Sequence, residues 1–319
     1  MTVTTRFAPS PTGPLHLGHA YSALLAHDMA MAQNGTFLLR IEDIDRARSK
    51  PEWEAQIYDD LAWLGLWWPT PVLRQSDRQT AYDAALDTLW DRALLFVCTC
   101  NRRDIAAAAS APQEGAPLTG PDGIIYPGTC RDRARSGLPP ELTPRPRDAA
   151  LRLDVWQAEL ARNGFHPRAG EPGLFASFTE TGAGADGQTG LITFTYQEII
   201  DTIGAVVLAR RDMGTSYHLS VVLDDAAQGV THVVRGADLF EATKIHVLLQ
   251  GLLGLPTPAY HHHRLIRDEA GKRLAKRDDA RALSKYRAEG ASPDDIRRLV
   301  GMPPADAPAP SLFQKNPRG

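Results

Sequence analysis

The stretch from residue 4 to residue 41 restricts the possible folds more than any other part of the chain. Thr4–Ala8 has the character of a short strand and runs into a proline-rich turn. Leu17–Ala32 places apolar side chains on one helical face, and Asn34-Gly35 is a typical helix stop. Thr36–Ile41 is an apolar run bounded by a turn and by charge, as expected of a buried parallel strand. Strand, glycine-containing turn, helix and strand in this order predict a doubly wound α/β fold.

The bulk composition limits where such a chain can act. Its 319 residues are 43% hydrophobic and 23% charged, as in an ordinary soluble protein. No run approaches the ~20 apolar residues of a membrane helix, and the N-terminus lacks the pattern of a signal peptide. We therefore expect a cytoplasmic protein without membrane contact. The net charge of −3 gives no general indication of nucleic-acid binding. Arg264–Arg287, with nine Lys or Arg against four Asp or Glu, is either a polyanion-binding face or a solvated surface.

The rest of the chain alternates between segments with a helix or strand pattern and segments typical of loops. Two amphipathic helices are expected at about 51–66 and 78–95. Residues 98–210 contain long loop-like stretches and are interpreted as an inserted lobe. Its strands are expected near 151–155, 191–196 and 204–209. Further elements are expected at Ser220–Leu223 (strand or helix), Thr231–Arg235 (strand), Phe240–Leu253 (helix), 281–289 and 292–300 (short helices, the second capped by Ser292).

Two histidines bracket a glycine at the predicted start of the first helix: His16, Gly18 and His19. A helix N-terminus offers unpaired N–H groups and partial positive charge, which suit phosphate, and the glycine permits close approach of a nucleoside. The two histidines can donate to phosphate oxygens in a transition state. Ordinary capping residues also satisfy this short pattern. The longer string Arg6–His19 (Arg-Phe-Ala-Pro-Ser-Pro-Thr-Gly-Pro-Leu-His-Leu-Gly-His) is far more specific.

Acidic side chains follow the second predicted strand in the string Arg40-Ile-Glu-Asp-Ile-Asp-Arg46. Ligands of open α/β sheets bind at the carboxyl ends of the strands, so one carboxylate could pair with a substrate ammonium. A charged loop with a helix cap is the alternative interpretation.

The three cysteines are Cys98, Cys100 and Cys130, and an odd number argues against a disulfide framework. Cys-x-Cys can bring two thiolates to one metal and Cys130 can add a third, but tetrahedral zinc needs a fourth ligand. From spacing alone, buried free cysteines are an equally good interpretation.

Two later segments say little in isolation. Ser216–Asp238 is typical of core followed by a turn. Asp268–Arg277 is a glycine-bearing basic loop, which could close over a triphosphate but is more often simply solvated.

Considered together, these strings resemble class I aminoacyl-tRNA synthetases. Arg6–His19 resembles the HIGH-type motif in its glutamyl form, and Arg40–Asp45 resembles the Arg-Ile-Glu-Asp-x-Asp string of glutamyl enzymes. Asp268–Arg277 resembles the KMSKS-type loop. The cysteine segment resembles the glutamyl-Q tRNA(Asp) synthetases, truncated relatives of glutamyl-tRNA synthetases, which have two close cysteines and then Tyr-x-x-x-Cys.

The resemblance implies roles for the matching residues. Those expected to bind glutamate are Arg6, Ala8, Ser10, Glu42, Tyr217 and Arg235. In this group Glu42 would hold the α-amino group, and Arg235, eighteen residues after Tyr217, would hold the side-chain carboxylate through its planar fork. Those expected to bind ATP, with Mg²⁺, are His16, Gly18, His19 and Lys276, of which His16, His19 and Lys276 would be catalytic. Those expected to hold one structural Zn²⁺ are Cys98, Cys100, Tyr126 and Cys130. No residue is assigned as a general base.

The same resemblance implies a Rossmann-like class I catalytic domain with an inserted zinc-bearing lobe and a short helical C-terminal region. The expected parts are 1–97 (first half of the catalytic domain), 98–210 (inserted lobe), 211–255 (second half), 256–302 (KMSKS-type loop and helical region) and 303–319 (disordered tail). Three positions depart from the family: Arg264 replaces a proline, Arg273 a lysine and Ala275 a serine. We expect slower activation from the two changes in the basic loop, at Arg273 and Ala275, and not its loss.

The chain continues for 42 residues after Arg277, where a full glutamyl-tRNA synthetase has a large anticodon-binding domain. The resemblance thus implies a monomer that activates glutamate with ATP and transfers it to queuosine in the anticodon loop of tRNA(Asp). One alternative is a truncated glutamyl-tRNA synthetase that charges a tRNA 3′ end. Another is a non-catalytic paralogue that binds glutamate or tRNA. A different HIGH-family nucleotidyltransferase would have no use for the pair Arg6 and Arg235.

Overall fold

Two sheets of mainly parallel strands form the centre of the molecule in the computed structural model, which describes residues 2–109, 119–121, 123–131, 143–158, 175–184, 186–267 and 281–305. The first sheet has the order β1 (Thr4–Phe7), β2 (Thr36–Ile41), β3 (Leu73–Arg74), all parallel. The second has the order β11 (His232–Gly236), β12 (Ala259–His263), β8 (Phe175–Glu180), β9 (Gly190–Thr195), in which β9 alone runs antiparallel to its neighbour.

Hydrogen bonds join the two sheets at their first strands. The amide of Thr231, just before β11, donates to the carbonyl of Thr4 at 2.9 Å, and the amide of Thr4 donates to Thr231 Oγ1 at 2.8 Å. Residues 227 positions apart in the sequence therefore lie side by side. The carboxyl ends of β1, β2 and β11 consequently face a shared region, as expected for ligand binding in an open α/β sheet.

Helix α1 (Leu17–Met31) covers this junction. It packs against β1, β2 and β11 and buries Ala23, Leu24 and Met29, so its amino end points at the carboxyl ends of the strands. The predicted helix, the following turn and the strand β2 are thus confirmed, because local periodicity and the positive φ of Asn34 agree with the tertiary packing.

A second group of helices packs beside the β11 strand. Helices α3 (Gln79–Asp91), α8 (Tyr217–Ala227) and α9 (Ala242–Leu253) contact one another over a large apolar core. The segment Ser220–Leu223, for which strand and helix were both open, belongs to α8. Helix α9 ends at Gly254, whose φ of 65° lies in the left-handed region that glycine tolerates best.

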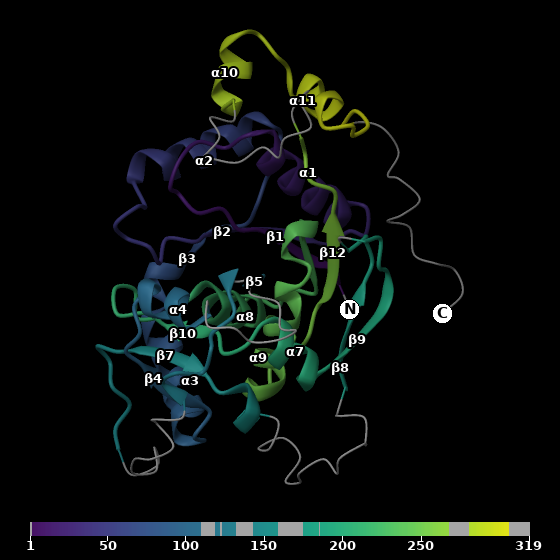
Figure 1. Ribbon diagram of the computed structural model, residues 1–319. Coiled ribbons are helices and arrows are strands. Elements are labelled where there is room, and N and C mark those ends of the chain that lie inside the picture. The colour runs from purple at the N-terminus through teal and green to yellow at the C-terminus, as the bar shows by residue number, and fades with distance from the viewer. Residues whose placement is uncertain are drawn as a thin grey trace.

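A third, antiparallel sheet lies below the first in Figure 1, with the order β10 (Val207–Ala209), β7 (Ala150–Leu153), β4 (Leu95–Cys98). The strands expected near 151–155, 191–196 and 204–209 correspond to β7, β9 and β10. However, β8 pairs with β12 through Glu180 and Tyr260, so residues 175–195 are bonded to the sheet that holds β11. The elements not yet named are α2 (Pro51–Trp63), η1 (Gln75–Asp77), α4 (Arg102–Ala109), β5 (Thr119–Gly120), β6 (Gly123–Ile124), α7 (Tyr196–Thr202), η3 (Ala237–Leu239), α10 (Leu283–Ala288) and α11 (Pro293–Leu299).

The C-terminal helices α10 and α11 sit above α1 and α2 in Figure 1. Ser292 caps α11, as the sequence predicted. Arg264, at a position where the resemblance led us to expect a proline, donates to the carbonyl of Val300 at 2.6 Å and lies over the ring of Tyr21, so it ties β12 to the end of α11. The expected KMSKS-type loop, Asp268–Arg277, and the tail after residue 305 lie outside the described residues. Among the described helices, none combines the length and apolar character that a membrane span requires.

Candidate functional site

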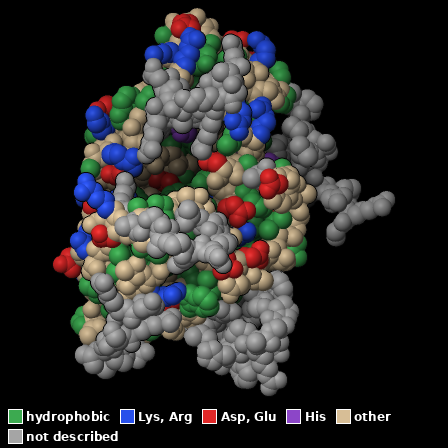
Figure 2. Space-filling view, in the orientation of Figure 1, with side chains coloured by type: hydrophobic (Ala, Val, Ile, Leu, Met, Phe, Trp, Pro, Cys, Tyr) green, Lys and Arg blue, Asp and Glu red, His purple; other side chains and the backbone are tan. Residues whose placement is uncertain are grey.

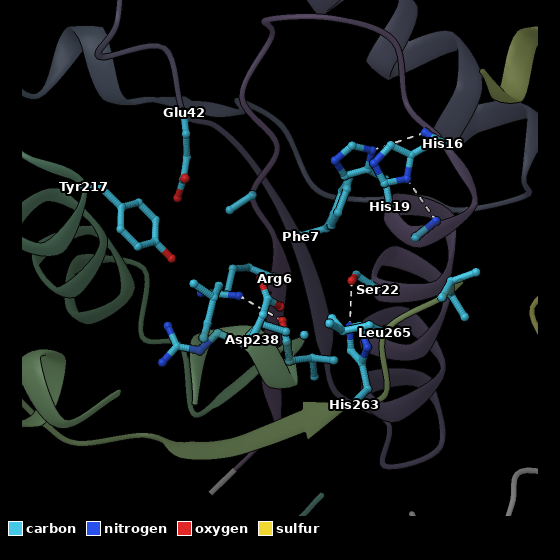
Figure 3. A pocket seen from close by; sticks show the side chains of 17 residues that line it. Arg6, Phe7, His16, His19, Ser22, Glu42, Tyr217, Asp238, His263 and Leu265 are labelled. Atoms are coloured by element: carbon cyan, nitrogen blue, oxygen red, sulfur yellow. Dashed lines mark hydrogen bonds between the residues drawn. The ribbon is translucent and has the colours of Figure 1, made fainter. Parts of the chain in front are cut away.

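A cavity of about 370 Å³ opens where the carboxyl ends of β1, β2 and β11 meet the amino end of α1. Figure 3 shows Glu42 and Tyr217 on one side of it and His16 and His19 on the opposite side, with Arg6 between them. Figure 2 shows this face of the molecule hollowed near its centre, with Lys and Arg side chains gathered above and to the left of the hollow. Of the residues expected to bind glutamate or ATP, those that line this cavity are Arg6, Ala8, His16, Gly18, His19, Glu42, Tyr217 and Arg235.

The two histidines form the amino-terminal cap of α1. His16 Nδ1 accepts from the amide of Gly18 at 3.1 Å, and His19 Nδ1 accepts from the amide of His16 at 3.2 Å. Both rings therefore carry their proton on Nε2 when neutral. The rings stack at 3.8 Å between centroids. A Cβ on Gly18 would lie 3.0 Å from His16 Cε1, so glycine is what allows the ring to fold back over the helix end.

A buried network of ion pairs fixes the charged side chains Arg6 and Glu42 that line the cavity. Asp225 of α8 accepts from Arg6 Nε at 3.0 Å and from Arg40 Nη1 at 2.7 Å. Arg40, which is fully buried, also donates from Nη2 to Glu42 Oε1 at 3.2 Å. Burial opposes ionisation of Asp225, but the charges of Arg6 and Arg40 outweigh it and lower the pKa of this carboxyl.

Glu42 has the opposite electrostatic balance. Its side chain is 9% exposed, and burial raises the pKa of its carboxyl in spite of the nearby charges of Arg40 and Arg6. Glu42 therefore has a weaker set of partners within the chain than Asp225 has. A cation bound in the cavity, such as an ammonium group, would supply the missing compensation.

Arg235 is held in a different manner from the buried arginines Arg6 and Arg40. Its Nε donates to His262 Nε2 at 3.1 Å, its Nη1 lies 3.0 Å from His246 Nδ1, and its Nη2 donates to Thr243 Oγ1 at 2.6 Å. All three acceptors are uncharged in these contacts. Among the described residues, Arg235 makes no ion pair with a carboxylate, although it is only 6% exposed. Such a cation is a ready binding site for an anion.

Tyr217 begins α8, next to Ser216, whose hydroxyl caps the helix. Burial raises the pKa of the Tyr217 hydroxyl, so it stays protonated and able to donate a hydrogen bond near neutral pH. In Figure 3 this hydroxyl points into the cavity. Tyr217 and Arg235, which the sequence analysis coupled only by their separation, thus line the same cavity.

A second cavity of about 750 Å³ adjoins the first and shares with it Glu42, Tyr217 and Leu239. Ser10, expected to lie with Ala8, lines this second cavity. Its other charged lining comes from Arg48, Arg152, Arg210 and Arg211, against Asp45 and Asp212. Cys98 and Cys100 also line this cavity.

The three cysteines cluster as their spacing allowed. The sulfur atoms of Cys98, Cys100 and Cys130 all lie within 4.8 Å of one another. The Tyr126 hydroxyl lies 3.6 Å from Cys100 Sγ and accepts from the amide of Cys130 at 2.7 Å. Three thiols and one phenol oxygen converging on one point form a donor set that suits tetrahedral zinc. Burial opposes thiolate formation at Cys130, but hydrogen bonds from Tyr126 and Thr99 lower the pKa of this thiol to about 6.

Several residues of the site were not foreseen. Asp225 and Thr243 are ordinary helix residues by pattern, and Glu180 stands in a strand far from the motifs. Strand β12 contains three consecutive histidines, His261–His263. In the structure His262 contacts Arg235, and His263 Nε2 lies 2.7 Å from Ser22 Oγ at the edge of the cavity. Lys276, expected on the ATP side, belongs to the segment outside the described residues.

Comparisons with known proteins identify the family of this chain. Residues 2–117 and 179–308 match the family model of tRNA synthetases class I (E and Q), catalytic domain. The chain is 66% identical over 302 residues to the glutamyl-Q tRNA(Asp) synthetase of Rhodobacter capsulatus, covering 93% of this chain and 99% of that protein. It is 40% identical to the enzyme of the same name from Nocardia farcinica, over 94% of this chain and 85% of that protein.

Solved structures with the same fold include a glutamate tRNA ligase from Elizabethkingia meningosepticum in complex with its amino acid. The TM-score is 0.70 and the sequence identity 25%, over 98% of this chain. The chain spans 63% of the length of that ligase. The glutamate-tRNA synthetase of Elizabethkingia anophelis matches equally well, with 64% of its chain covered.

Proposed function

The chain belongs to the glutamyl-Q tRNA(Asp) synthetases, a group of class I tRNA synthetases, and is a ligase; we propose that it activates L-glutamate with ATP and transfers the glutamate to queuosine in the anticodon loop of tRNA(Asp). The observation that carries the glutamate assignment is that Arg235, buried in one cavity with Glu42, has no carboxylate partner among the residues that the structure describes. One offers a positive charge and the other a negative charge to a zwitterionic amino acid with an acidic side chain.

The cavity gives each part of glutamate a matching group. Arg235 binds the side-chain carboxylate, and Glu42 and the Tyr217 hydroxyl bind the α-ammonium end. Arg6, fixed by Asp225, lies between these groups and the two histidines, where it meets the α-carboxylate. A neutral isostere such as glutamine would leave Arg235 buried without a counter-charge, and the site should reject it for that reason.

ATP occupies the opposite side, at the amino end of α1. The α-carboxylate oxygen of glutamate attacks the α-phosphorus, a new P–O bond forms, and the bond to the bridging oxygen breaks to release pyrophosphate. The helix N-terminus, His16 and His19 through their Nε2–H groups, and Lys276 stabilise the charge on the phosphates. Mg²⁺, bound with ATP, would neutralise phosphate charge as well.

The second cavity is the place proposed for the nucleoside that accepts glutamate. It opens directly from Glu42 and Tyr217, and four arginines line it, which suits a phosphodiester backbone. There a hydroxyl of the cyclopentene-diol attacks the carbonyl carbon of the mixed anhydride, AMP leaves with the former anhydride oxygen, and the hydroxyl proton is lost. We assign no residue as the general base.

Zinc is proposed as a structural ion held by Cys98, Cys100, Tyr126 and Cys130. Because all four donors come from the protein, no position remains for a substrate. We also propose residues 1–97 and 211–255 as the two halves of the catalytic domain, 98–210 as the inserted lobe, whose strands β8 and β9 return to the sheet that holds β11, and 256–302 as the loop and helical region. The protein is proposed to work as a cytoplasmic monomer, where ATP and tRNA are available.

Glutamate-dependent exchange between ATP and labelled pyrophosphate, measured without tRNA, tests the activation step. We expect exchange with glutamate and at least about 100-fold less with glutamine. Absence of exchange with every amino acid would instead support a non-catalytic binding protein.

A further inference from the structure

Arg235 is the centre of a buried polar cluster that the proposed reaction does not by itself require. The cluster joins four elements: β11 with Arg235, β12 with His262, α9 with His246 and Thr243, and β8 with Glu180. All of these side chains are at most 6% exposed. Buried polar groups of this kind are costly unless each one is satisfied, so their arrangement restricts which atoms carry protons.

The hydrogen bonds fix the tautomer of both histidines. Arginine can only donate, so His262 Nε2 and His246 Nδ1 must both be unprotonated acceptors. His262 therefore carries its proton on Nδ1, which lies 2.5 Å from Glu180 Oε2. His246 carries its proton on Nε2 and directs it to His218 Nδ1 at 3.1 Å. Both rings are neutral in this arrangement.

Glu180 is itself locked in place by the backbone. Its Oε1 accepts from the amide of His262 at 2.9 Å and from the amide of Gly182 at 2.7 Å. Burial opposes its ionisation, but these bonds and the bond from the His262 ring lower the pKa of the Glu180 carboxyl. The negative charge of Glu180 is thus held behind the His262 ring and does not contact Arg235.

The consequence is visible when the buried arginines around this cavity, Arg6, Arg40 and Arg235, are compared. Arg6 and Arg40 each bond directly to the carboxylate of Asp225. Within the described part of the chain, Arg235 uses three of its five N–H donors on neutral acceptors, which leaves two donors and its full charge for a ligand of the cavity that it lines. The other charged groups near this cluster are Arg6, Glu42, Asp225 and Asp238, and Tyr260 lies beneath the guanidinium at 5.1 Å.

We propose that His246, His262 and Glu180 are positioning residues that hold Arg235 through neutral acceptors, so that its charge is kept for the side-chain carboxylate of the substrate and glutamate is preferred over glutamine. This inference rests on the proposed function, because it needs glutamate in the cavity. Replacing a neutral acceptor by a carboxylate would satisfy Arg235 internally and remove the reason to bind an anion.

The most direct test compares two substitutions of one size, His246→Gln and His246→Glu. Glutamine keeps a neutral acceptor for Arg235 Nη1, whereas glutamate places a carboxylate there. Isothermal titration of the full chain with L-glutamate should give a Kd at least about 30-fold weaker for His246→Glu than for His246→Gln. The ratio of the Kd for glutamine to that for glutamate should fall by a similar factor. Equal glutamate affinities in two folded variants would overturn the proposal.

A second variant avoids placing a new charge in the core. In Glu180→Gln the amide oxygen can still accept the two backbone N–H groups, so the amide nitrogen must face His262 Nδ1. His262 then has to carry its proton on Nε2, so two N–H donors, His262 Nε2 and Arg235 Nε, point at each other and their hydrogen bond is lost. We expect the KM for glutamate to rise about 10-fold with the KM for ATP unchanged. The matched control is Glu198→Gln, in an exposed capping box that accepts either residue. A KM for glutamate equal to that of the control would contradict the proposed role.

The readouts separate this inference from the proposed function. If the wild-type chain binds glutamate with the predicted variant pattern but transfers none to tRNA, the cluster keeps its role and the transfer assignment fails. If transfer occurs but His246→Glu and His246→Gln bind glutamate alike, the reaction is right and the positioning role is wrong. If the wild-type chain does not bind glutamate, Arg235 is not the anion site and the inference falls as well.

Discussion

Substitution of Glu42 by glutamine should separate substrate binding from folding. Glu42 accepts from Arg40 Nη2 at 3.2 Å, and the amide oxygen of glutamine can keep that bond in the same shape. Burial raises the pKa of the Glu42 carboxyl, so the folded chain gains little from the charge itself. The Asp225 carboxylate still neutralises Arg40 at 2.7 Å. We therefore expect the free energy of unfolding to stay constant or rise by up to about 1 kcal/mol.

Glutamate binding should become weaker in this variant, although its stability does not fall. The Glu42→Gln variant replaces a charge-assisted bond to the α-ammonium group by a neutral one, a loss of about 1–2 kcal/mol. This corresponds to a rise of roughly 5- to 30-fold in the KM for glutamate. The KM for ATP should not change, because the nucleotide lies on the His16 and His19 side of the cavity.

The assay is ATP–pyrophosphate exchange, titrated with glutamate at saturating ATP and with ATP at saturating glutamate, alongside urea unfolding. Glu198→Gln is the control for the loss of one carboxylate. A KM for glutamate within twofold of the control, or an equal rise in both KM values, would refute the assignment of Glu42 to the ammonium group. A loss of several kcal/mol of stability would refute the reasoning from its pKa.

Three further predictions follow from the same geometry. Gly18→Ala should raise the KM for ATP several-fold, because the added methyl group pushes the His16 ring away from the helix end. The Kd for glutamate, measured directly, should stay constant. A change confined to glutamate binding would contradict this prediction. Cys100→Ser should lower the zinc content measured by plasma mass spectrometry well below one ion per chain, and should lower Tm. Tyr126→Phe should reduce the affinity for zinc by a smaller amount. Full zinc occupancy in Cys100→Ser would exclude the site. Lowering the pH from 7 to 5 should reduce the free energy of unfolding, because burial lowers the pKa of His261 to about 4 in the folded chain. Below about pH 6.5 the unfolded chain therefore binds a proton on this histidine that the folded chain does not, which accounts for about 2 kcal/mol. Equal urea midpoints at both pH values would contradict this prediction.

The parts of this molecule that could be predicted are those specified by local sequence. The start of α1 at His16 and Gly18, the cap at Ser292 and the apolar helix α9 each depend on residues only a few positions apart. The cysteine cluster was predicted through the resemblance, because the spacing of Cys98, Cys100 and Cys130 alone left buried free cysteines as an equally good interpretation.

The surroundings of Arg235 could not be predicted in the same way. Glu180 meets His262 only because β8 pairs with β12, a parallel contact between residues 82 positions apart. Parallel pairing leaves no mark on the periodicity of either strand, and a buried histidine in a strand resembles any other core residue. Asp225 on α8 neutralises Arg6 and Arg40, which lie 219 and 185 positions away in the sequence. Its role also depends on tertiary packing and could not be predicted from local sequence.

Transfer of labelled glutamate to tRNA tests the central claim most directly. The full chain would be incubated with ATP, labelled glutamate and tRNA from cells that make queuosine, and in parallel with tRNA from cells that cannot. The proposed function predicts label only in the first pool, on tRNA(Asp). Equal label on tRNA(Glu) in both pools would contradict it and would assign the protein to charging of the 3′ end.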